Sequence, residues 1–590
     1  MASFRSPAPR RRLAGKPGLS LEGVNNLLIR GLVLVLIGMS IAVCNAQAAA
    51  PPAVRSRHAM VVCADQYAAE EGIRVLRRGG NAVDAAVAMG FILAVTYPEA
   101  GNIGGGGYML IRKYDGTACV VDFREKAPKA ATRTMYTYGA GPMTDKSVNG
   151  HLSVAVPGTV AGFKKVLDNL GTMKWSDLIR PAVDLAEKGI VVTEHNAHSF
   201  EEYDRELHLY PSTVKVFAKS GALPHEGDTL RQPDLAATLR RVQNGGADEF
   251  YRGETARLIL GEMRRGGGLI TEDDLKNYSA IVCKPLEASY RGYTILAVPP
   301  SSSGGICLLE LLNIVEGYDL KSMGFHSSRA VHVMTEAMKR VYVDRAEFMG
   351  DPKFVDVPTD ALVSKNYADE RRKGIDTARA GSGKSVRHGD VQDRPGKHTT
   401  HYAVIDDSGT VVTTTYTLND SYGSKVVVDG AGFFLNDEMD DFSVMPGVPN
   451  LYGLVGGDAN SIEPEKRPLS SMSPAIVLKN DKPVMVLGAR GGSKIITAVF
   501  QTIVNVIDFG MSAQEAVDAP RFHHQWSPDT LLYERFCFPE DVIHNLQNMG
   551  HSLKEIGYSL GQIEVISRDL EKGWIYGAPD PREGGTAVGY

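Results

Sequence analysis

The chain has 590 residues, of which 43% are hydrophobic and 23% charged, a composition typical of globular proteins and a length that allows more than one core. Its formal net charge is −5, and because residues 1–48 hold six basic side chains and one acidic, the remainder carries −10. So acidic a chain is a poor candidate for nucleic-acid binding.

The first fifty residues differ from the rest of the chain. A basic leader, with arginines at 10–12, precedes an apolar run from Leu32 to Val43, and Ala46-Gln47-Ala48 follows. This pattern predicts a signal peptide over residues 1–48 and export to the periplasm or beyond. The run has about twelve residues against the roughly 20 that span a bilayer, so no stable membrane span is expected after signal removal. Retention as a signal anchor is the alternative.

Five cysteines follow residue 48: Cys63, Cys119, Cys283, Cys307 and Cys537. Their odd number and unpaired spacing argue against a disulfide framework, and buried free thiols are expected.

Helical spacing begins after His58. It predicts a helix over 65–78, capped by Gly79-Gly80-Asn81, and a core helix over 82–96 that is apolar nearly all round. Four glycines at 104–107 then lead into a strand over 108–112. No P-loop lysine follows them, so close backbone packing is the better interpretation than a phosphate site.

A strand over 118–123 ends on Asp122-Phe123-Arg124-Glu125. An arginine at a strand end can bind a carboxylate through two parallel hydrogen bonds, and it can equally form a surface ion pair. Beyond it, helical spacing recurs without an internal repeat over 159–170, 174–189, 231–243, 254–266, 306–316 and 328–348.

Residues 376–398 are polar and glycine-rich, and they predict a disordered linker. A Walker-like tract at 378–385 has Ala378 in place of the first glycine and no preceding strand, so no nucleotide site is predicted. No metal site is predicted either. His398 and His401 lack a third ligand, and His523-His524 fits hydrogen-bonded packing better.

After the linker, two β-branched runs flank Asp406-Asp407-Ser408-Gly409 and predict a hairpin that starts at Thr399. Cleavage before a threonine frees an α-amino group that can take the hydroxyl proton near neutral pH. The alternative from spacing alone is an ordinary strand residue.

Later segments offer further polar groups. Ser470-Ser471 follows a proline, and a strand over 483–487 leads to Gly491-Gly492 just before a helix that begins at Lys494. Backbone N–H groups at such a helix start can face a developing oxyanion, though a plain helix start is equally compatible. A Gly- and Pro-flanked loop over 446–457 carries Tyr452 at its centre.

Taken together, five motifs resemble the γ-glutamyltranspeptidase family in their order along the chain. They are Thr399-Thr400-His401-Tyr402, Thr417-Leu418-Asn419, Asn436 to Phe442, Arg467 to Pro474 and Gly491-Gly492-Ser493, within a likeness from about His58 to Tyr590. The resemblance implies an α+β fold, a four-layer αββα N-terminal-nucleophile hydrolase sandwich. It also implies self-cleavage between His398 and Thr399 into a large subunit, 49–398, and a small catalytic subunit, 399–590, that stay together as a heterodimer.

The resemblance assigns roles residue by residue. Thr399 would be the nucleophile and its own base, hydrogen-bonded by Thr417, with Gly491 and Gly492 at the oxyanion. The donor's α-carboxylate would be bound by Arg124, Ser470 and Ser471, its α-ammonium by Asn419, Glu438 and Asp441, and Tyr452 would close over it.

The implied reaction transfers the γ-glutamyl group of glutathione and related amides to water or to amino acids and dipeptides, without a metal or organic cofactor. One alternative is a related glutaryl or poly-γ-glutamyl acylase on the same scaffold. Another is an exported binding protein that is never processed.

Overall fold

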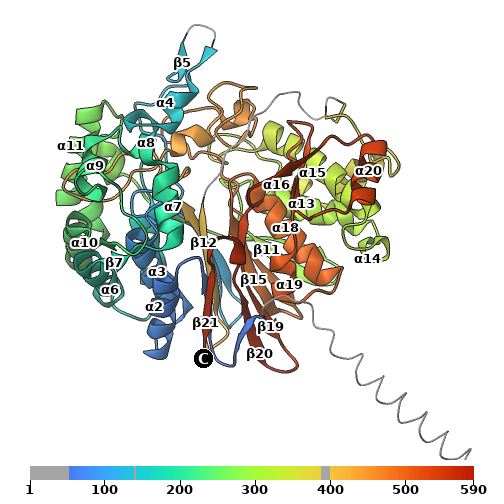
Figure 1. Ribbon diagram of the computed structural model, residues 1–590, viewed down its shortest axis with the longest axis horizontal. Helices are drawn as coiled ribbons and strands as arrows, with labels where there is room; N and C mark the ends of the chain where they lie inside the picture. The colour runs from blue at the N-terminus through green and yellow to red at the C-terminus, as the bar shows by residue number, and fades with distance from the viewer. Residues whose placement is uncertain (1–51, 139–140, 384, 387–398) are drawn as a thin grey trace, which may run out of the picture. The chain divides into compact units, whose positions relative to one another are not determined.

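The computed structural model describes residues 52–590 except 139–140, 384 and 387–398. The expected signal peptide and His398 lie outside these residues. Two seven-stranded sheets are stacked between two layers of helices, which gives the expected αββα sandwich (Figure 1). In the described part of the chain, no helix combines the length and the apolar character that crossing a membrane requires.

Sheet one is antiparallel throughout. Its strands, in spatial order, are β1 (Val54–Ser56), β20 (Trp574–Ala578), β19 (Gln562–Asp569), β15 (Lys482–Arg490), β14 (Ala475–Lys479), β11 (Tyr293–Ala297) and β10 (Leu286–Tyr290). Strand β15 runs three residues beyond the expected end at Leu487. The reason is that β19 pairs with it as far as Arg490, across from Gln562.

Sheet two is antiparallel as well. It contains β21 (Thr586–Gly589), β2 (Met60–Cys63), β12 (Thr400–Ile405), β13 (Val411–Thr417), β3 (Gly106–Arg112), β4 (Ala118–Asp122) and β9 (Ile281–Cys283). The predicted hairpin is therefore confirmed as the central pair β12–β13. Both strands are buried along their whole length, including the four threonines of β13.

The two sheets enclose an apolar core of their own. Met60, Leu110 and Ile405 of sheet two pack with Ile476 and Val486 of sheet one, all of them nearly inaccessible to solvent. Gly488 on β15 lies so close to His401 on β12 that an added Cβ would come within 2.3 Å of the imidazole. A glycine at 488 thus lets the sheets meet closely near the start of β12.

Helices cover both outer faces. α2 (Gln66–Arg77), α3 (Ala82–Thr96) and α5 (Thr159–Leu170) pack on sheet two, and α13 (Gly304–Glu316), α18 (Lys494–Ile507) and α19 (Ala513–Asp518) pack on sheet one. All fifteen residues of α3 are buried, as its apolar sequence predicts. Asn81 caps the start of α3 rather than the end of α2, because its side chain accepts from the first free N–H groups of that helix.

Further helices build the outer parts of both layers. They are α6 (Trp175–Lys188), α7 (Glu194–Glu202), α10 (Pro233–Arg252), α11 (Glu254–Gly266) and α15 (Ser328–Phe348). α10 runs nine residues past the predicted end at 243, with a break at Gly246, where φ is 69°. The five cysteines described are free; Cys63, Cys307 and Cys537 are buried, whereas Cys119 and Cys283 are only partly so.

The predicted linker does not begin where its composition suggests. The carbonyl of Asp376 accepts from His332 at 2.8 Å, and Gly381 N–H donates to Glu336 at 3.1 Å. Gly383 N–H donates to Asp529 at 2.6 Å, and its carbonyl accepts from Trp526 at 2.7 Å. Residues 376–383 are therefore ordered through their backbone groups, which a composition argument about apolar burial does not detect.

A buried ion pair ties the segment after α19 to the end of sheet one. Arg521 donates to Asp580 at 2.8 Å, and both side chains are at most 2% exposed. Replacing Asp580 with Asn should lower the free energy of unfolding by about 3–5 kcal/mol, because it leaves the guanidinium without its counter-charge.

Denaturant unfolding of the purified protein checks this prediction. Asp168→Asn, which removes the carboxylate from the exposed pair with Lys164, is the matched control and should cost under about 1 kcal/mol. Equal losses in the two variants would contradict the assignment.

Candidate active site

A small pocket lies at the start of the central hairpin. It is lined by Arg124, Thr399, Thr417, Asn419, Asp441, Tyr452, Ser470, Ser471, Met472, Gly492 and Ile495. The tertiary structure thus gathers nine of the residues singled out from the sequence, from segments almost 370 positions apart. Glu438 and Gly491 lie outside this lining.

Strand pairing brings the two threonines together. Thr400 lies opposite Tyr416 in the β12–β13 register, so continuing the register by one residue places Thr399 opposite Thr417. Both are buried, at 4% and 2% exposure. The Thr417 hydroxyl accepts from the backbone N–H of Asn419 at 2.9 Å and donates to the carbonyl of the same residue at 3.4 Å.

Asn419 turns the chain at the pocket wall. Its φ is 85°, a left-handed conformation that asparagine tolerates better than most residues. Its side chain donates to the carbonyl of Asp437 at 3.2 Å, and its own carbonyl accepts from the Tyr452 hydroxyl at 2.6 Å. The turn therefore connects the hairpin to both the acidic segment and the loop that carries Tyr452.

The loop with Tyr452 covers the pocket. The aromatic ring lies against Gly492 so closely that a Cβ there would come within 2.3 Å of it, and Gly492 has a φ of 58°. Asn450 donates to Asp441 at 3.1 Å, and Leu451 N–H donates to Asp440 at 2.7 Å. The closed position thus depends on a glycine below the ring and on two carboxylates at the base of the loop.

Arg124 is fully buried and pairs with three carboxylates, those of Glu438, Asp441 and, at 3.5 Å, Glu125. Burial by itself would lower the pKa of Arg124, but these carboxylates, Glu438 foremost, raise it, so the guanidinium stays charged. Its Nε donates to the carbonyl of Pro468 at 3.2 Å, and the hydroxyl of Tyr278 donates to its backbone carbonyl at 2.8 Å.

Burial disfavours the charged form of the carboxylates around Arg124. Burial raises the pKa of Glu438 well above its usual range, although the nearby Arg124 opposes that rise. Burial likewise raises the pKa of Glu125 to about 8. Because Glu438 contacts the guanidinium and does not line the pocket, its direct effect is to orient Arg124.

The two serines are presented by a turn that is fixed from below. Ser470 Oγ accepts from the N–H of Met472 at 3.1 Å, and Ser471 Oγ accepts from Arg345 at 3.3 Å. Arg345 also donates to Ser303 at 2.9 Å. Sequence reasoning missed Arg345, although a charged residue in α15, where residues 330–346 are all buried, was a signal for it.

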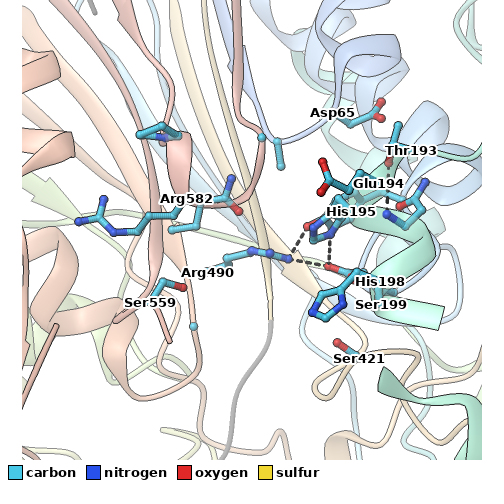
Figure 2. A pocket seen from close by; sticks show the side chains of 18 of the residues that line it. Asp65, Thr193, Glu194, His195, His198, Ser199, Ser421, Arg490, Ser559 and Arg582 are labelled. Atoms are coloured by element: carbon cyan, nitrogen blue, oxygen red, sulfur yellow. Dashed lines mark hydrogen bonds and ion pairs between the residues drawn. The ribbon is translucent and has the colours of Figure 1, made fainter. Parts of the chain in front are cut away.

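The two glycines before α18 line two different spaces. Gly492 lines the pocket, whereas Gly491, with a φ of 130°, lines a larger cavity on the other side. Only glycine readily adopts these two conformations in succession. Arg490, left without a role in the sequence analysis, points into that cavity and pairs with Glu99 at 2.7 Å (Figure 2).

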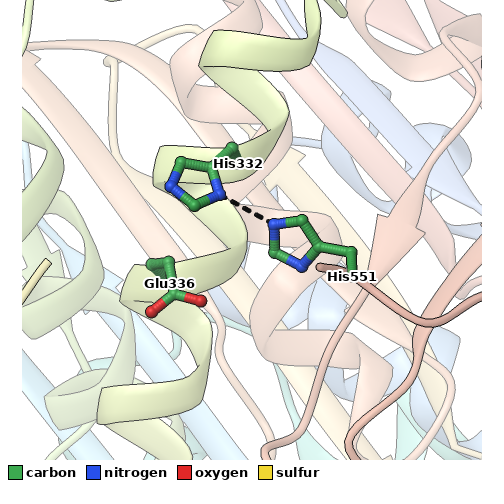
Figure 3. A group of neighbouring side chains, drawn as sticks. All are labelled: His332, Glu336 and His551. Carbon is green, nitrogen blue, oxygen red and sulfur yellow. Dashed lines mark hydrogen bonds between the residues drawn. The ribbon is translucent and has the colours of Figure 1, made fainter. Parts of the chain in front are cut away.

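Histidines weighed for metal binding are engaged in hydrogen bonds. His401 contacts the Thr415 hydroxyl at 2.9 Å, and burial lowers its pKa to about 3; His523 contacts Thr497 at 2.8 Å. His332, Glu336 and His551 form a separate group with ligand-like spacing. In it, Nδ1 of His332 lies 2.8 Å from Nε2 of His551 (Figure 3).

The carboxylate of that group is already occupied. Glu336 pairs with Lys339 at 3.1 Å and with Arg340 at 2.8 Å, and it accepts from Gly381. Two adjacent cations oppose a metal ion, so we assign the group a structural role in holding residues 376–383.

Asp440 provides a pH test of this site. Its carboxylate is 1% exposed and accepts from Ser147 at 2.6 Å, and burial raises its pKa to about 7. The unfolded chain releases this proton near pH 4, and the folded chain releases it near 7. The free energy of unfolding should therefore fall by about 1.4 kcal/mol per pH unit between these values, and then stay level.

Asp440→Asn should remove this slope, so the difference in unfolding free energy between wild type and variant should change from pH 4 to 7. Denaturant unfolding across that range measures it, with Asp168→Asn as a control that leaves the slope in place. Parallel curves for wild type and Asp440→Asn would show that Asp440 titrates normally.

Known proteins resemble the chain over nearly its whole length. The family described as gamma-glutamyltranspeptidase matches residues 68–590. A glutathione hydrolase proenzyme of Escherichia coli strain K12 is 46% identical over 557 residues, covering 91% of this chain and 95% of that protein. Another, from Pseudomonas sp. strain A14, is 44% identical over 570 residues, covering 94% and 98%.

Among solved structures, a cephalosporin acylase from Bacillus halodurans superposes with a TM-score of 0.82 at 28% identity, covering 92% of this chain and 98% of that one. With the matches above, this similarity extends from the sequence motifs to the fold that carries the pocket. The chain belongs to the gamma-glutamyltranspeptidase family.

Proposed function

We propose that the chain is a self-cleaving γ-glutamyltransferase and glutathione hydrolase with Thr399 as its nucleophile. The observation that carries the proposal is the pocket itself. Its lining contains this threonine together with Thr417, Arg124 and Asp441. The relatives named proenzymes support a chain that is cut before it acts.

Cleavage between His398 and Thr399 creates the catalytic amine. The fragments 49–398 and 399–590 would remain together as a heterodimer, because each contributes strands to both sheets. In sheet two, β2 and β3 of the larger fragment flank β12 and β13 of the smaller one. Separating the fragments would break this pairing and expose the core between the sheets.

The reaction then needs only groups of this chain. The freed amine of Thr399 takes the hydroxyl proton as the oxygen attacks the γ-amide carbonyl, and the N–H groups of Gly491 and Gly492 bind the oxyanion. The amine next gives the proton to the departing nitrogen. A γ-glutamyl ester remains on Thr399, and water or an acceptor amine cleaves it. No metal or organic cofactor has a step to perform.

Opposite charges on the pocket wall match the carboxylate and the ammonium that the donor's α-carbon carries. Arg124 with the hydroxyls of Ser470 and Ser471 would bind the α-carboxylate, and Asn419 with Asp441 would bind the α-ammonium. Glu438 would act through Arg124, since it contacts the guanidinium rather than the pocket. Tyr452 would open to admit the donor and then exclude water from the ester.

Location follows from the leader sequence. The signal-like residues 1–48 favour an exported protein that works in the periplasm or outside the cell, on glutathione and other γ-glutamyl compounds.

A related acylase is the second candidate, because the similar structure from Bacillus halodurans is a cephalosporin acylase. The carboxylate of Asp441 in the pocket wall favours a donor that carries an ammonium, which a glutaryl group lacks.

Thr399→Ala should abolish both cleavage and turnover. A denaturing gel of the purified variant should show one full-length band, where the wild type shows two fragments and the smaller begins at Thr399 by N-terminal sequencing. Thr399→Ser retains a hydroxyl and an amine, so it should still be cut. A wild-type chain that hydrolyses γ-glutamyl-p-nitroanilide with the 398–399 bond intact would overturn the proposal, and an unprocessed, inactive wild type would indicate a binding protein.

Asp441→Asn should weaken use of γ-glutamyl-p-nitroanilide far more than use of glutaryl-p-nitroanilide. Losing one partner of a buried charge pair costs about 2–5 kcal/mol, which is roughly 30- to several-thousandfold in kcat/KM. The glutaryl substrate is the internal control, since it has no ammonium to lose. A wild-type preference for the glutaryl compound would favour the acylase instead.

A further inference from the structure

A buried cation lies behind the pocket serines without a carboxylate partner. Arg345 of α15 is 4% exposed and is hydrogen-bonded to two hydroxyls, and no ion pair joins it to a carboxylate of any described residue. Arg340, five residues earlier on the same helix, pairs with Glu336 at 2.8 Å. Because a buried charge is normally compensated in this way, the exception at Arg345 points to a role beyond stability.

The second arginine of the site shows the contrast. Arg124, which lines the pocket, has three carboxylates within ion-pair distance. Burial lowers the pKa of both arginines, but nearby carboxylates reverse that shift only for Arg124. The charge of Asp441 also acts on Arg345, from beyond ion-pair distance, but this carboxylate is already paired with Arg124. Arg345 thus brings a positive charge that its own contacts do not balance.

The contacts of Arg345 fix the direction of a hydrogen bond at the pocket. Its Nη2 donates to Ser471 Oγ at 3.3 Å, and its Nε donates to Ser303 Oγ at 2.9 Å. A guanidinium has only donors, so Ser471 Oγ must accept on this side and keeps its own proton for another partner. No described residue accepts that proton, and Ser471 lines the pocket. The hydroxyl is therefore available as a donor inside the pocket.

Ser470 is held by the same arginine at one remove. Its carbonyl accepts from Ser303 Oγ at 2.6 Å, and Ser303 in turn accepts from Arg345. The Oγ of Ser470 accepts from a backbone N–H at 3.1 Å, so this hydroxyl also keeps its proton for donation. Two hydroxyl donors in one pocket lining match a carboxylate, because an ionised carboxylate only accepts.

We infer that Arg345 is a positioning residue for the donor substrate: it holds the Ser471 hydroxyl as a hydrogen-bond donor to the α-carboxylate. This inference rests on the proposed function and adds a residue to its donor recognition. A hydroxyl that accepts from a cation is polarised, so its own hydrogen bond to a carboxylate is strengthened. The α-carboxylate in turn supplies the negative charge that the residues around Arg345 do not.

A stability measurement separates this role from a structural one. Because Arg345 has no carboxylate partner, replacing it with the apolar methionine leaves no acid unpaired. Arg345→Met should therefore keep or raise the denaturation midpoint, and the chain should still be cut between residues 398 and 399. Arg340→Met is the matched control. It should lower the midpoint, because it takes a cation away from Glu336 in the same helix.

The activity measurement compares two donors, γ-glutamyl-p-nitroanilide and the analogue in which an amide replaces the α-carboxylate. Processed wild type should prefer the carboxylate compound. Arg345→Met and Ser471→Ala should each reduce that preference roughly 10- to 100-fold in kcat/KM, the range for one hydrogen bond to a charged group. The two losses should not multiply in the double variant, because both act through one hydroxyl.

Two further variants bracket the result. Arg345→Lys keeps a cation that can only donate, so its preference for the carboxylate compound should lie between those of the wild type and Arg345→Met. Arg340→Met should keep the wild-type preference, because Arg340 contacts neither serine of the pocket.

The outcomes distinguish this inference from the proposed function. A wild-type preference in Arg345→Met, or an equal loss with both donors, would overturn the role of Arg345 while hydrolysis persists. An Arg345→Met chain that stays uncut would also overturn it, since a residue that acts on the donor leaves cleavage unaffected. A wild type that releases no p-nitroaniline from the carboxylate compound would overturn the proposed function, and the role of Arg345 with it.

Discussion

The pairing of β12 with β13 is the constraint on which the site depends. These strands lie at the centre of sheet two, buried on both faces, with strands from the earlier part of the chain on each side. Their register sets Thr399 opposite Thr417, and the Asn419 turn that follows receives the hydroxyl of Tyr452. A threonine on an exposed loop would lack this preorganisation, whereas Thr399 directly precedes a core strand.

Buried charge is the second organising feature, and it is expensive. Arg124 and Glu438 are removed from water and Asp441 is partly buried, and the pKa of Glu438 is raised by burial despite the nearby arginine. Such groups persist where charge pairs and hydrogen bonds compensate them, as Glu438, Asp441 and the carbonyl of Pro468 do for the Arg124 guanidinium. The result is a small pocket whose wall carries both signs of charge, as a donor with an α-carboxylate and an α-ammonium requires.

The glycine pair Gly491-Gly492 lies between two spaces of different size. On one side Gly492 lies under Tyr452 in a small pocket, and on the other Gly491 lines a larger cavity. Two adjacent glycines make this possible, since their positive φ values turn the backbone sharply between β15 and α18. Substitutions that line one space can therefore leave the lining of the other unchanged.

Local pattern in the sequence was enough for most elements and for the family. The limits of α3, α5 and α15 follow from helical spacing, the hairpin from its turn, and the site residues from motifs whose order resembles the family. What it could not supply were contacts between distant segments. The order of residues 376–383, the extension of β15 to Arg490, the support of Ser471 by Arg345 and the position of Glu438 behind Arg124 all depend on partners far away in the chain. Periodicity and capping are written in neighbouring residues, whereas burial, charge pairing and cavities arise only when the sheets and helices pack together.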